Sequence, residues 1–270
     1  MTSSVTAVWR HRSVLWLLVI RDLTVKYQQS VLGYLWSLIE PLAVACTYWF
    51  VFGLLYKTKV GPEGESYILF LVSGLFAWIW INAVLSEATT ALTAQARLIT
   101  TINMPREMFP IGRVFGKFFE YLAAMPVLLI IAVANHAKFG VALLLLPLAV
   151  LLQMIFLIGL SMLLASLNVM LRDTEKFIRL VQRMLFYALP IIYPLTLVTN
   201  SHNGVPHWVK VVYQANPLVG IFELHHAAWV PSAGVPPAPL LISAAVGSVL
   251  MLLLGWVAFR RLEPAVLKEL

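Results

Sequence analysis

Two adjacent histidines, His225 and His226, are the first residues in this sequence whose types suggest metal or acid–base chemistry. Glu223 lies just before them in the same apolar stretch. Neighbouring residues on a helix point about 100° apart, so the two rings are not expected to converge on one metal ion. The single cysteine, Cys46, offers no disulfide, zinc site or redox pair. We therefore expect neither a metal centre nor a catalytic residue.

Nucleotide hydrolysis is not predicted for this chain either. Gly112, Gly116 and Lys117 come closest to a phosphate-binding loop, but the spacing is too short. Phenylalanine also follows Lys117, where a magnesium-binding Ser or Thr is needed. The sequence lacks an H-E-x-x-H helix, a G-x-S-x-G turn and the clustered aspartates of metal-assisted glycosyl transfer. We expect no cofactor in the chain itself.

Two acidic residues, Glu40 and Glu120, stand beside or within apolar runs, where carboxylates are costly and are usually paired or functional. Lys26 or Arg21 would pair with Glu40, and Lys117 precedes Glu120 by one helical turn. Because such partners are available, structural ion pairs are favoured over proton-coupled roles.

A segment over 87–117 has the residue types of a docking site for another protein. A stretch compatible with a helix comes first, and Pro105 and Pro110 then interrupt any continuous helix. Arg106 and Glu107 lie between these prolines, so we expect a short rigid element that carries adjacent opposite charges. The alternative is a solvated basic loop that only sets the membrane topology.

A second charged segment contains the adjacent pair Arg172 and Asp173. Arg179 and Arg183 follow one turn apart on a predicted helix, where they suit contacts with lipid headgroups. We assign only Arg172 and Asp173 to a contact with a partner protein.

The elements that position these residues are membrane helices. With 61% hydrophobic and only 11% charged residues, the chain is not an ordinary soluble domain. Its runs of about 20 apolar residues predict an all-α integral membrane protein with six transmembrane helices. These are expected over roughly 36–56, 66–86, 118–137, 141–162, 184–198 and 240–259. The fourth helix should project beyond the bilayer, and Pro190 and Pro194 should bend the fifth.

Basic residues predict the orientation of these helices. Nearly all of them fall in the N-terminal segment, in the two charged segments above and in the tail over 260–270. The opposite side holds only Lys57, Lys59, Lys138 and Lys210. Because positive loops favour the cytoplasm, we expect both termini there. The same asymmetry explains the net charge of +7 without nucleic acid, for which no motif exists.

The transmembrane domain, expected over 36–259, is flanked by two less regular parts. Residues 1–35 are predicted to hold an amphipathic helix at the membrane boundary, with Trp16 and Ile20 toward lipid and Asp22 and Lys26 toward water. The outer segment 199–239 contains an apolar stretch, Pro217–Trp229, that is too short to cross. We expect this stretch to be re-entrant or interfacial.

Aromatic residues recur at helical spacing on three predicted spans. They are Tyr48, Phe52 and Tyr56 on the first, Phe76 and Trp80 on the second, and Phe186, Tyr187 and Tyr193 on the fifth. Sugar rings stack on aromatic side chains, so these residues suit the lining of a glycan channel. The alternative is an aromatic belt at the membrane interface.

The order of these features resembles the membrane subunit of type 2 ABC exporters for lipid-linked polysaccharides, the Wzm and TagG permeases. The resemblance is carried first by the spacing of Arg21-Asp22, Tyr27, Ser30, Leu32-Gly33, Trp36 and Pro41. It extends over the interfacial helix, the spans, the two charged loops and the outer segment.

The resemblance implies a homodimeric permease in the bacterial cytoplasmic membrane, driven by two copies of a Wzt- or TagH-like ATPase that binds ATP and magnesium. The cargo would be an O-antigen, a teichoic acid or a cell-wall galactan. The implied ATPase-coupling residues are Asn103, Met104, Pro105, Arg106, Glu107, Pro110, Arg172 and Asp173. The implied entrance for the lipid head consists of Arg21, Asp22, Lys26 and Tyr27.

Three alternatives stay open at this point. An exporter of a drug or smaller lipid would share the architecture. A membrane-embedded acyl- or glycosyltransferase would need convergent polar residues within the spans, and the sequence has almost none. A passive channel would leave the basic inner loops without a purpose.

Overall fold

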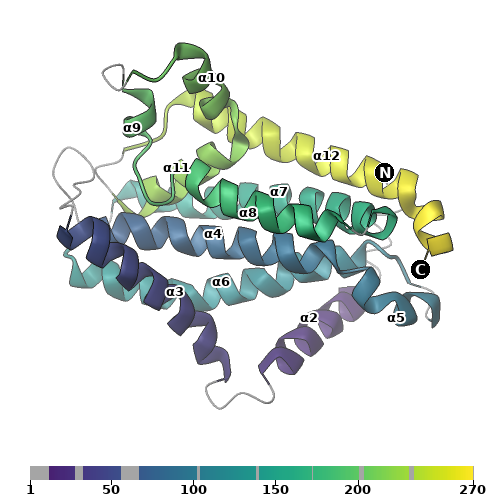
Figure 1. Cartoon of the computed structure of the whole chain (residues 1–270). Helices are drawn as coiled ribbons and strands as arrows, with labels where there is room; N and C mark the ends of the chain where they lie inside the picture. Colours follow the sequence, from purple (N-terminus) through teal and green to yellow (C-terminus); the bar gives the residue numbers. More distant parts are fainter. Residues whose placement is uncertain are drawn as a thin grey trace.

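The structure, a computed structural model, describes residues 12–27, 33–55, 67–101, 104–137, 140–171, 173–200, 204–230 and 234–269. Every regular element within these residues is a helix, which confirms the predicted all-α class. Figure 1 shows the long helices lying roughly side by side as one bundle.

The helices follow one another with short connections. The first are α2 (Arg12–Tyr27), η1 (Gly33–Leu35), α3 (Trp36–Tyr48) and the π-helical η2 (Trp49–Leu55). Next come α4 (Tyr67–Thr89), η3 (Thr93–Gln95), α5 (Ala96–Thr101), α6 (Met108–Ala134), η4 (Val141–Leu144) and α7 (Leu145–Met170). The last are α8 (Thr174–Ala188), α9 (Thr196–Thr199), α10 (His207–Ala215), α11 (Pro217–Trp229) and α12 (Ala238–Glu269).

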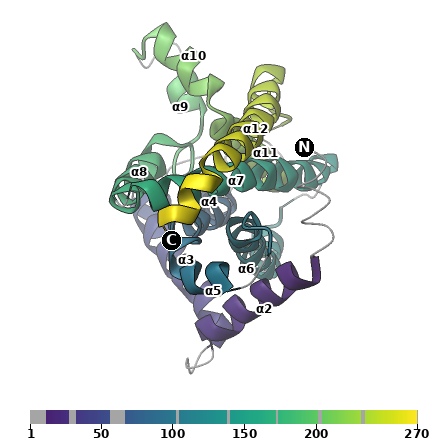
Figure 2. The same cartoon turned by 90° about the vertical axis from the view of Figure 1, so that its right-hand side faces the viewer.

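Helix α4 is the centre of the fold. In its most apolar stretch 78% of the residues are buried, against 28% in α6 and 22% in α12. It packs against α3, α6, α7, α8 and α11, which Figure 2 shows around it in a view along the bundle. Because α4 is hydrophobic on all sides, other helices must cover it, whereas the outer helices keep apolar faces for lipid.

Helices α7 and α12 approach each other most closely. Gly159 on α7 and Gly255 on α12 face each other, and a Cβ atom added to either would collide with the backbone of the other helix. Small residues let membrane helices come into backbone contact. This crossing fixes α12 along α7.

Four helical segments are long and apolar enough to cross a membrane: Tyr67–Thr89, Met108–Ala134, Val141–Met170 and Ala238–Val266. A shorter apolar helix over Leu42–Leu55 occupies the region of the predicted first span. The fourth predicted helix continues to Met170, as its long charge-free run indicates. The structure therefore supports a multi-pass membrane protein.

The expected fifth span does not form one helix. Helix α8 ends at Ala188, residues 189–195 are irregular, and α9 begins only at Thr196. The prediction of a helix over 184–198 is therefore wrong beyond Ala188. Pro190 and Pro194 lack N–H donors and disfavour a helical residue before each of them, so they end the helix instead of bending it.

Helix α6 begins earlier than the predicted third span. It starts at Met108, so Pro110 lies in its first turn, where a missing N–H costs no intrahelical hydrogen bond. The expected separate element between Pro105 and Pro110 is therefore wrong. Residues 104–107 form the described part of the connection from α5.

Helix α11 is buried among α4, α7 and α12. The Asn216 side chain accepts a hydrogen bond from the Leu218 N–H at 3.0 Å, and Pro217 occupies the first turn, so the helix has a well-formed start. Helix α10 lies at the end of the bundle opposite α5 in Figure 1. A dip of α11 into the bilayer stays a prediction.

Candidate functional site

A cavity of about 330 Å³ lies between α3, α4, α6 and α8. Its wall includes Phe76, Trp78 and Trp80 from α4 and Phe186 from α8. Three of these were predicted from the sequence as glycan-channel residues. Phe76 and Trp80 are each only 2% exposed, so they form a rigid wall packed into the core.

The other predicted aromatic residues extend this wall. Tyr48 and Phe52 stack with ring centroids 6.1 Å apart, and Tyr48 lies 5.7 Å from Phe186. Phe186 in turn contacts Trp78 at 5.8 Å and Tyr187 at 5.2 Å. The fold thus brings aromatic side chains from α3, η2, α4 and α8 into one continuous group.

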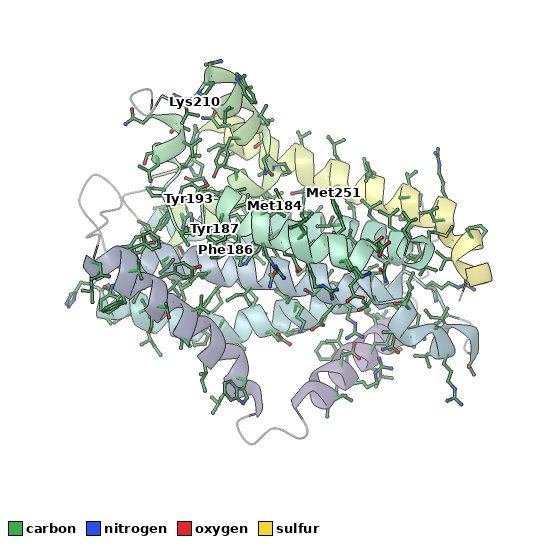
Figure 3. All side chains as sticks on the ribbon, viewed as in Figure 1. Met184, Phe186, Tyr187, Tyr193, Lys210 and Met251 are labelled. Atoms are coloured by element: carbon green, nitrogen blue, oxygen red, sulfur yellow. The ribbon has the colours of Figure 1, made fainter. Side chains whose placement is uncertain are left out.

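Tyr193 lies at the edge of this group, beyond the end of α8. Its hydroxyl donates to the Tyr187 carbonyl at 3.1 Å and lies 3.1 Å from the Tyr213 hydroxyl on α10. Figure 3 shows Phe186, Tyr187 and Tyr193 gathered near the end of α8. The Lys210 ammonium on α10 donates to the carbonyls of Thr199 and Asn200 at 3.2 and 3.1 Å. Helix α10 is therefore tied to the irregular segment that follows α8.

A second, polar cavity of about 400 Å³ shares Lys117 and Glu120 with the aromatic one. The Lys117 ammonium lies 2.6 Å from Glu87 and 2.9 Å from Glu120. Arg113, one turn earlier on α6, lies 3.0 Å from Asp22 on α2. Lys117 is thus neutralised by Glu120, as predicted, and additionally by Glu87 from α4.

The predicted lipid-head entrance lies beside this polar cavity. Arg21 pairs with Asp22 at 2.8 Å, and both line the cavity. Asp22 faces α6 instead of the water side of α2, so its predicted position is wrong; the charge of Arg113 attracts it there. Trp16 and Ile20 are exposed, as a lipid-facing side requires. The side chains of Lys26, Tyr27 and Glu40, and the residues Tyr56, Asn103 and Arg172, lie outside the described part.

The predicted coupling residues before α6 face the bundle. Arg106 Nη1 lies 2.8 Å from Glu263 Oε1, and Glu107 Oε1 lies 3.2 Å from Arg260 Nη2. Glu107 is only 4% exposed. These residues therefore contact the end of α12, which the sequence did not indicate.

The remaining coupling residues are less closely associated. Met104 and Pro105 are half-buried, and Pro110 is buried in the first turn of α6. Asp173, at the start of α8, is exposed and lies 3.2 Å from Lys176 on the same helix. The structure thus assigns it a local, solvent-facing ion pair of small energetic weight.

The two histidines bind different neighbours, as their angular separation predicts. His226 Nε2 donates to the Pro190 carbonyl at 2.8 Å, which leaves its Nδ1 to accept from Ser73 at 3.0 Å. His225 Nε2 lies 2.8 Å from the Gln153 side-chain oxygen. Both rings are buried, so they join α11 to α4, α7 and the irregular segment. Their geometry is that of structural hydrogen bonding.

The family model of the ABC-2 type transporter matches residues 13–228 of this 270-residue chain. This chain belongs to the ABC-2 type transporter family. The match includes both cavities and the residues that line them. An ABC-2 protein is a transport subunit, which agrees with the membrane-crossing helices and with the cavity between them.

Several named proteins are similar to this ABC-2 chain. An O-antigen export system permease protein RfbA from Klebsiella pneumoniae is 30% identical over 186 residues, which cover 68% of this chain and 70% of that protein. RfbA from Myxococcus xanthus is 25% identical and covers 92% of both chains. The polysialic acid transport protein KpsM from Escherichia coli is 24% identical and covers 93% of both.

Sequence reasoning missed three features of this ABC-2 site. Glu87 was seen only as the start of a loop, although it completes the Lys117 pairs. Tyr213 was not singled out, although it contacts Tyr193. Arg260 and Glu263 were seen as part of a basic tail. Their one-turn spacing was the only available signal, because Arg106 is 157 positions away from Glu263.

Proposed function

We propose that this ABC-2 protein is the membrane subunit of an ATP-driven exporter of a lipid-linked polysaccharide. The observation that carries the proposal is the similarity, over nearly the whole chain, to RfbA from M. xanthus and KpsM from E. coli, whose names state O-antigen export and polysialic acid transport. In keeping with this family, six spans would cross the bilayer, both termini would be cytoplasmic, and two copies would work with two copies of a separate ATPase.

The aromatic cavity suits this cargo. Its wall is formed largely by flat rings, and its polar groups are concentrated at Lys117 and Glu120. Sugar C–H faces can stack on such rings without a directional hydrogen bond that would hold the polymer in place. Tyr48, Phe52 and Tyr187 continue the aromatic surface beyond the cavity, so a chain of sugars would meet similar contacts along its path.

The polar cavity beside α2 suits the cargo's anionic lipid end. Arg21, Arg113 and Lys117 supply positive charge next to a helix whose Trp16 and Ile20 are exposed. Each of these cations also has a nearby acid, so a phosphate would compete with Asp22, Glu87 and Glu120 for them. This competition favours transient binding of the head over tight capture.

Export of a drug or smaller lipid is the second candidate, because a cavity of about 330 Å³ would also accommodate a small apolar molecule. The two candidates differ in what stimulates the ATPase. A lipid-linked glycan would stimulate hydrolysis only if its sugars are recognised or moved, whereas a small apolar substrate would do so without sugars.

The proposal is tested by reconstituting the chain with its ATPase in liposomes and measuring ATP hydrolysis and glycan movement. The additives are a lipid-linked oligosaccharide, the same lipid pyrophosphate without sugars, and a hydrophobic dye. We expect the first to give the largest stimulation and to cross the bilayer. Equal stimulation by the dye would replace the polysaccharide assignment, and ATP-independent movement would overturn the exporter assignment.

A further inference from the structure

Four charged side chains join the connection before α6 to the C-terminal part of α12. Arg106 lies 2.8 Å from Glu263, Glu263 lies 3.3 Å from Arg260, and Arg260 lies 3.2 Å from Glu107. We call these four residues the α6–α12 charge chain. Its members alternate in sign and come from two segments far apart in the sequence, so it holds these segments together by ion pairs alone.

The charge chain is sheltered from water. The side chains of Arg106, Glu107 and Glu263 are 25%, 5% and 19% exposed. Charges at this depth are screened less than surface charges, and a member that loses its partner is left unpaired in a poorly solvated place. The chain is therefore a stronger link than the exposed pairs along α8.

An apolar cluster surrounds the same junction. Phe259 and Val266 of α12 are buried together with Met108 and Phe109 of α6. Ile99 of α5 and Leu18 of α2 belong to this cluster as well. In both views the C-terminal end of α12 lies at the same end of the bundle as α5 (Figure 1 and Figure 2). A displacement of the 104–107 connection would therefore press directly on α12.

Helix α12 can carry such a displacement into the transmembrane region. It packs along α7, and the crossing at Gly159 and Gly255 leaves no room for the two backbones to slide independently. Pro264 cannot donate to the Arg260 carbonyl, so α12 lacks one hydrogen bond within the charge chain and bends there more easily. The junction thus combines a firm ionic contact with a local point of flexure.

We propose that Arg260 and Glu263 are positioning residues of energy coupling, which transmit movement of the 104–107 connection to α12 and α7. This inference rests on the proposed function, because it requires an ATPase that pushes on the connection. It changes the role of Arg106 and Glu107 as well. They act toward α12 within the subunit, and the outer surface of the connection and of α5 is left for the ATPase.

The test uses the full chain with its ATPase in liposomes. Glu263→Gln keeps the shape of the side chain and removes its charge, and Arg260→Gln removes the central cation. We expect both complexes to assemble and hydrolyse ATP, while the glycan exported per ATP falls about fivefold or more. Arg261→Gln is the matched control, because Arg261 is adjacent, exposed and outside the charge chain. It should keep the wild-type ratio.

The outcomes separate this inference from the proposed function. If the wild-type complex exports no glycan, the proposed function fails regardless of the variants. If the wild type exports and both glutamine variants keep its ratio of glycan to ATP, the positioning role is overturned while the function stands. A uniform loss of assembled complex leads to a second variant, in which Arg106→Glu, Glu107→Arg, Arg260→Glu and Glu263→Arg invert every pair. Restored coupling supports the proposal, and a coupling defect in an assembled inverted complex contradicts it.

Discussion

Lys117 on α6 lies 2.6 Å from Glu87 at the end of α4, and its side chain is only 5% exposed. This pair connects the aromatic cavity to the polar one, because Lys117 lines both. Glu120 completes the arrangement at 2.9 Å. A buried cation with two acidic partners can hold the central helix against α6 only while both partners stay charged.

Replacing Lys117 with methionine should destabilise the protein. The substitution leaves Glu87 and Glu120 close together without their shared cation, and we expect the free energy of unfolding to fall by about 1–3 kcal/mol. Thermal unfolding in detergent measures this effect. Lys176→Met is the control, since its pair with Asp173 is exposed, and it should change stability by about 0.5 kcal/mol or less. Equal effects of the two variants would contradict the buried-pair interpretation.

Gly159→Ala should also destabilise the protein, because the added methyl group would collide with the backbone of α12 near Met251. We expect a loss of about 1–3 kcal/mol, seen as a lower midpoint of thermal unfolding. Gly116→Ala is the comparison. A Cβ atom there meets nothing, and alanine favours helix by about 0.5–1 kcal/mol, so α6 should be unchanged or stabilised. A tolerated alanine at Gly159 would show that α7 and α12 are less tightly packed.

Gln153→Leu should weaken the attachment of α11. Gln153 accepts from His225 at 2.8 Å and donates to the Ala77 carbonyl at 3.0 Å, and both bonds are buried. Leaving the His225 N–H without a partner should cost about 1–3 kcal/mol in thermal unfolding. Tyr121→Phe removes only the longer contact to His225, at 3.3 Å, and should cost about 1 kcal/mol or less. The reverse order of effects would refute this assignment of the network.

Filling the aromatic cavity should block transport while ATP hydrolysis continues. Ala83 lines the cavity, so Ala83→Trp places a large ring in the space that the cargo would occupy. We expect glycan movement in liposomes to fall to near background, with basal hydrolysis retained. Ala123→Trp, on an exposed position of α6, is the size-matched control and should export normally. Normal export by Ala83→Trp would show that the cargo takes another path.

Much of the architecture was predictable because apolar run length has a simple physical meaning. A run without charges must be helical in lipid to satisfy its backbone, so α4, α7 and α12 were expected close to their observed positions. Local proline chemistry was harder to interpret. Pro110 was expected to break a helix but lies in the first turn of α6, whereas Pro190 and Pro194 were expected to bend a helix that ends at Ala188.

The candidate site was predictable only as a set of residue types. Helical spacing placed Phe76 and Trp80 on one face of a span, and the structure places both in the cavity wall. The contact of Tyr48 with Phe186 joins helices that are distant in the sequence, so no local pattern could indicate it. Lys117 was paired in advance with Glu120, which is one turn away, but Glu87 could not be assigned without the packing of α4 on α6.

The sequence by itself determined that this chain is a helical membrane protein without a nucleotide-binding or metal-binding motif, because composition and spacing act locally. Only the tertiary structure decided which charges meet. Arg106 pairs with Glu263 and Asp22 pairs with Arg113, since the packing of α2, α6 and α12 brings their backbones within reach. Electrostatic attraction depends on distance in space, which the linear order of residues does not specify.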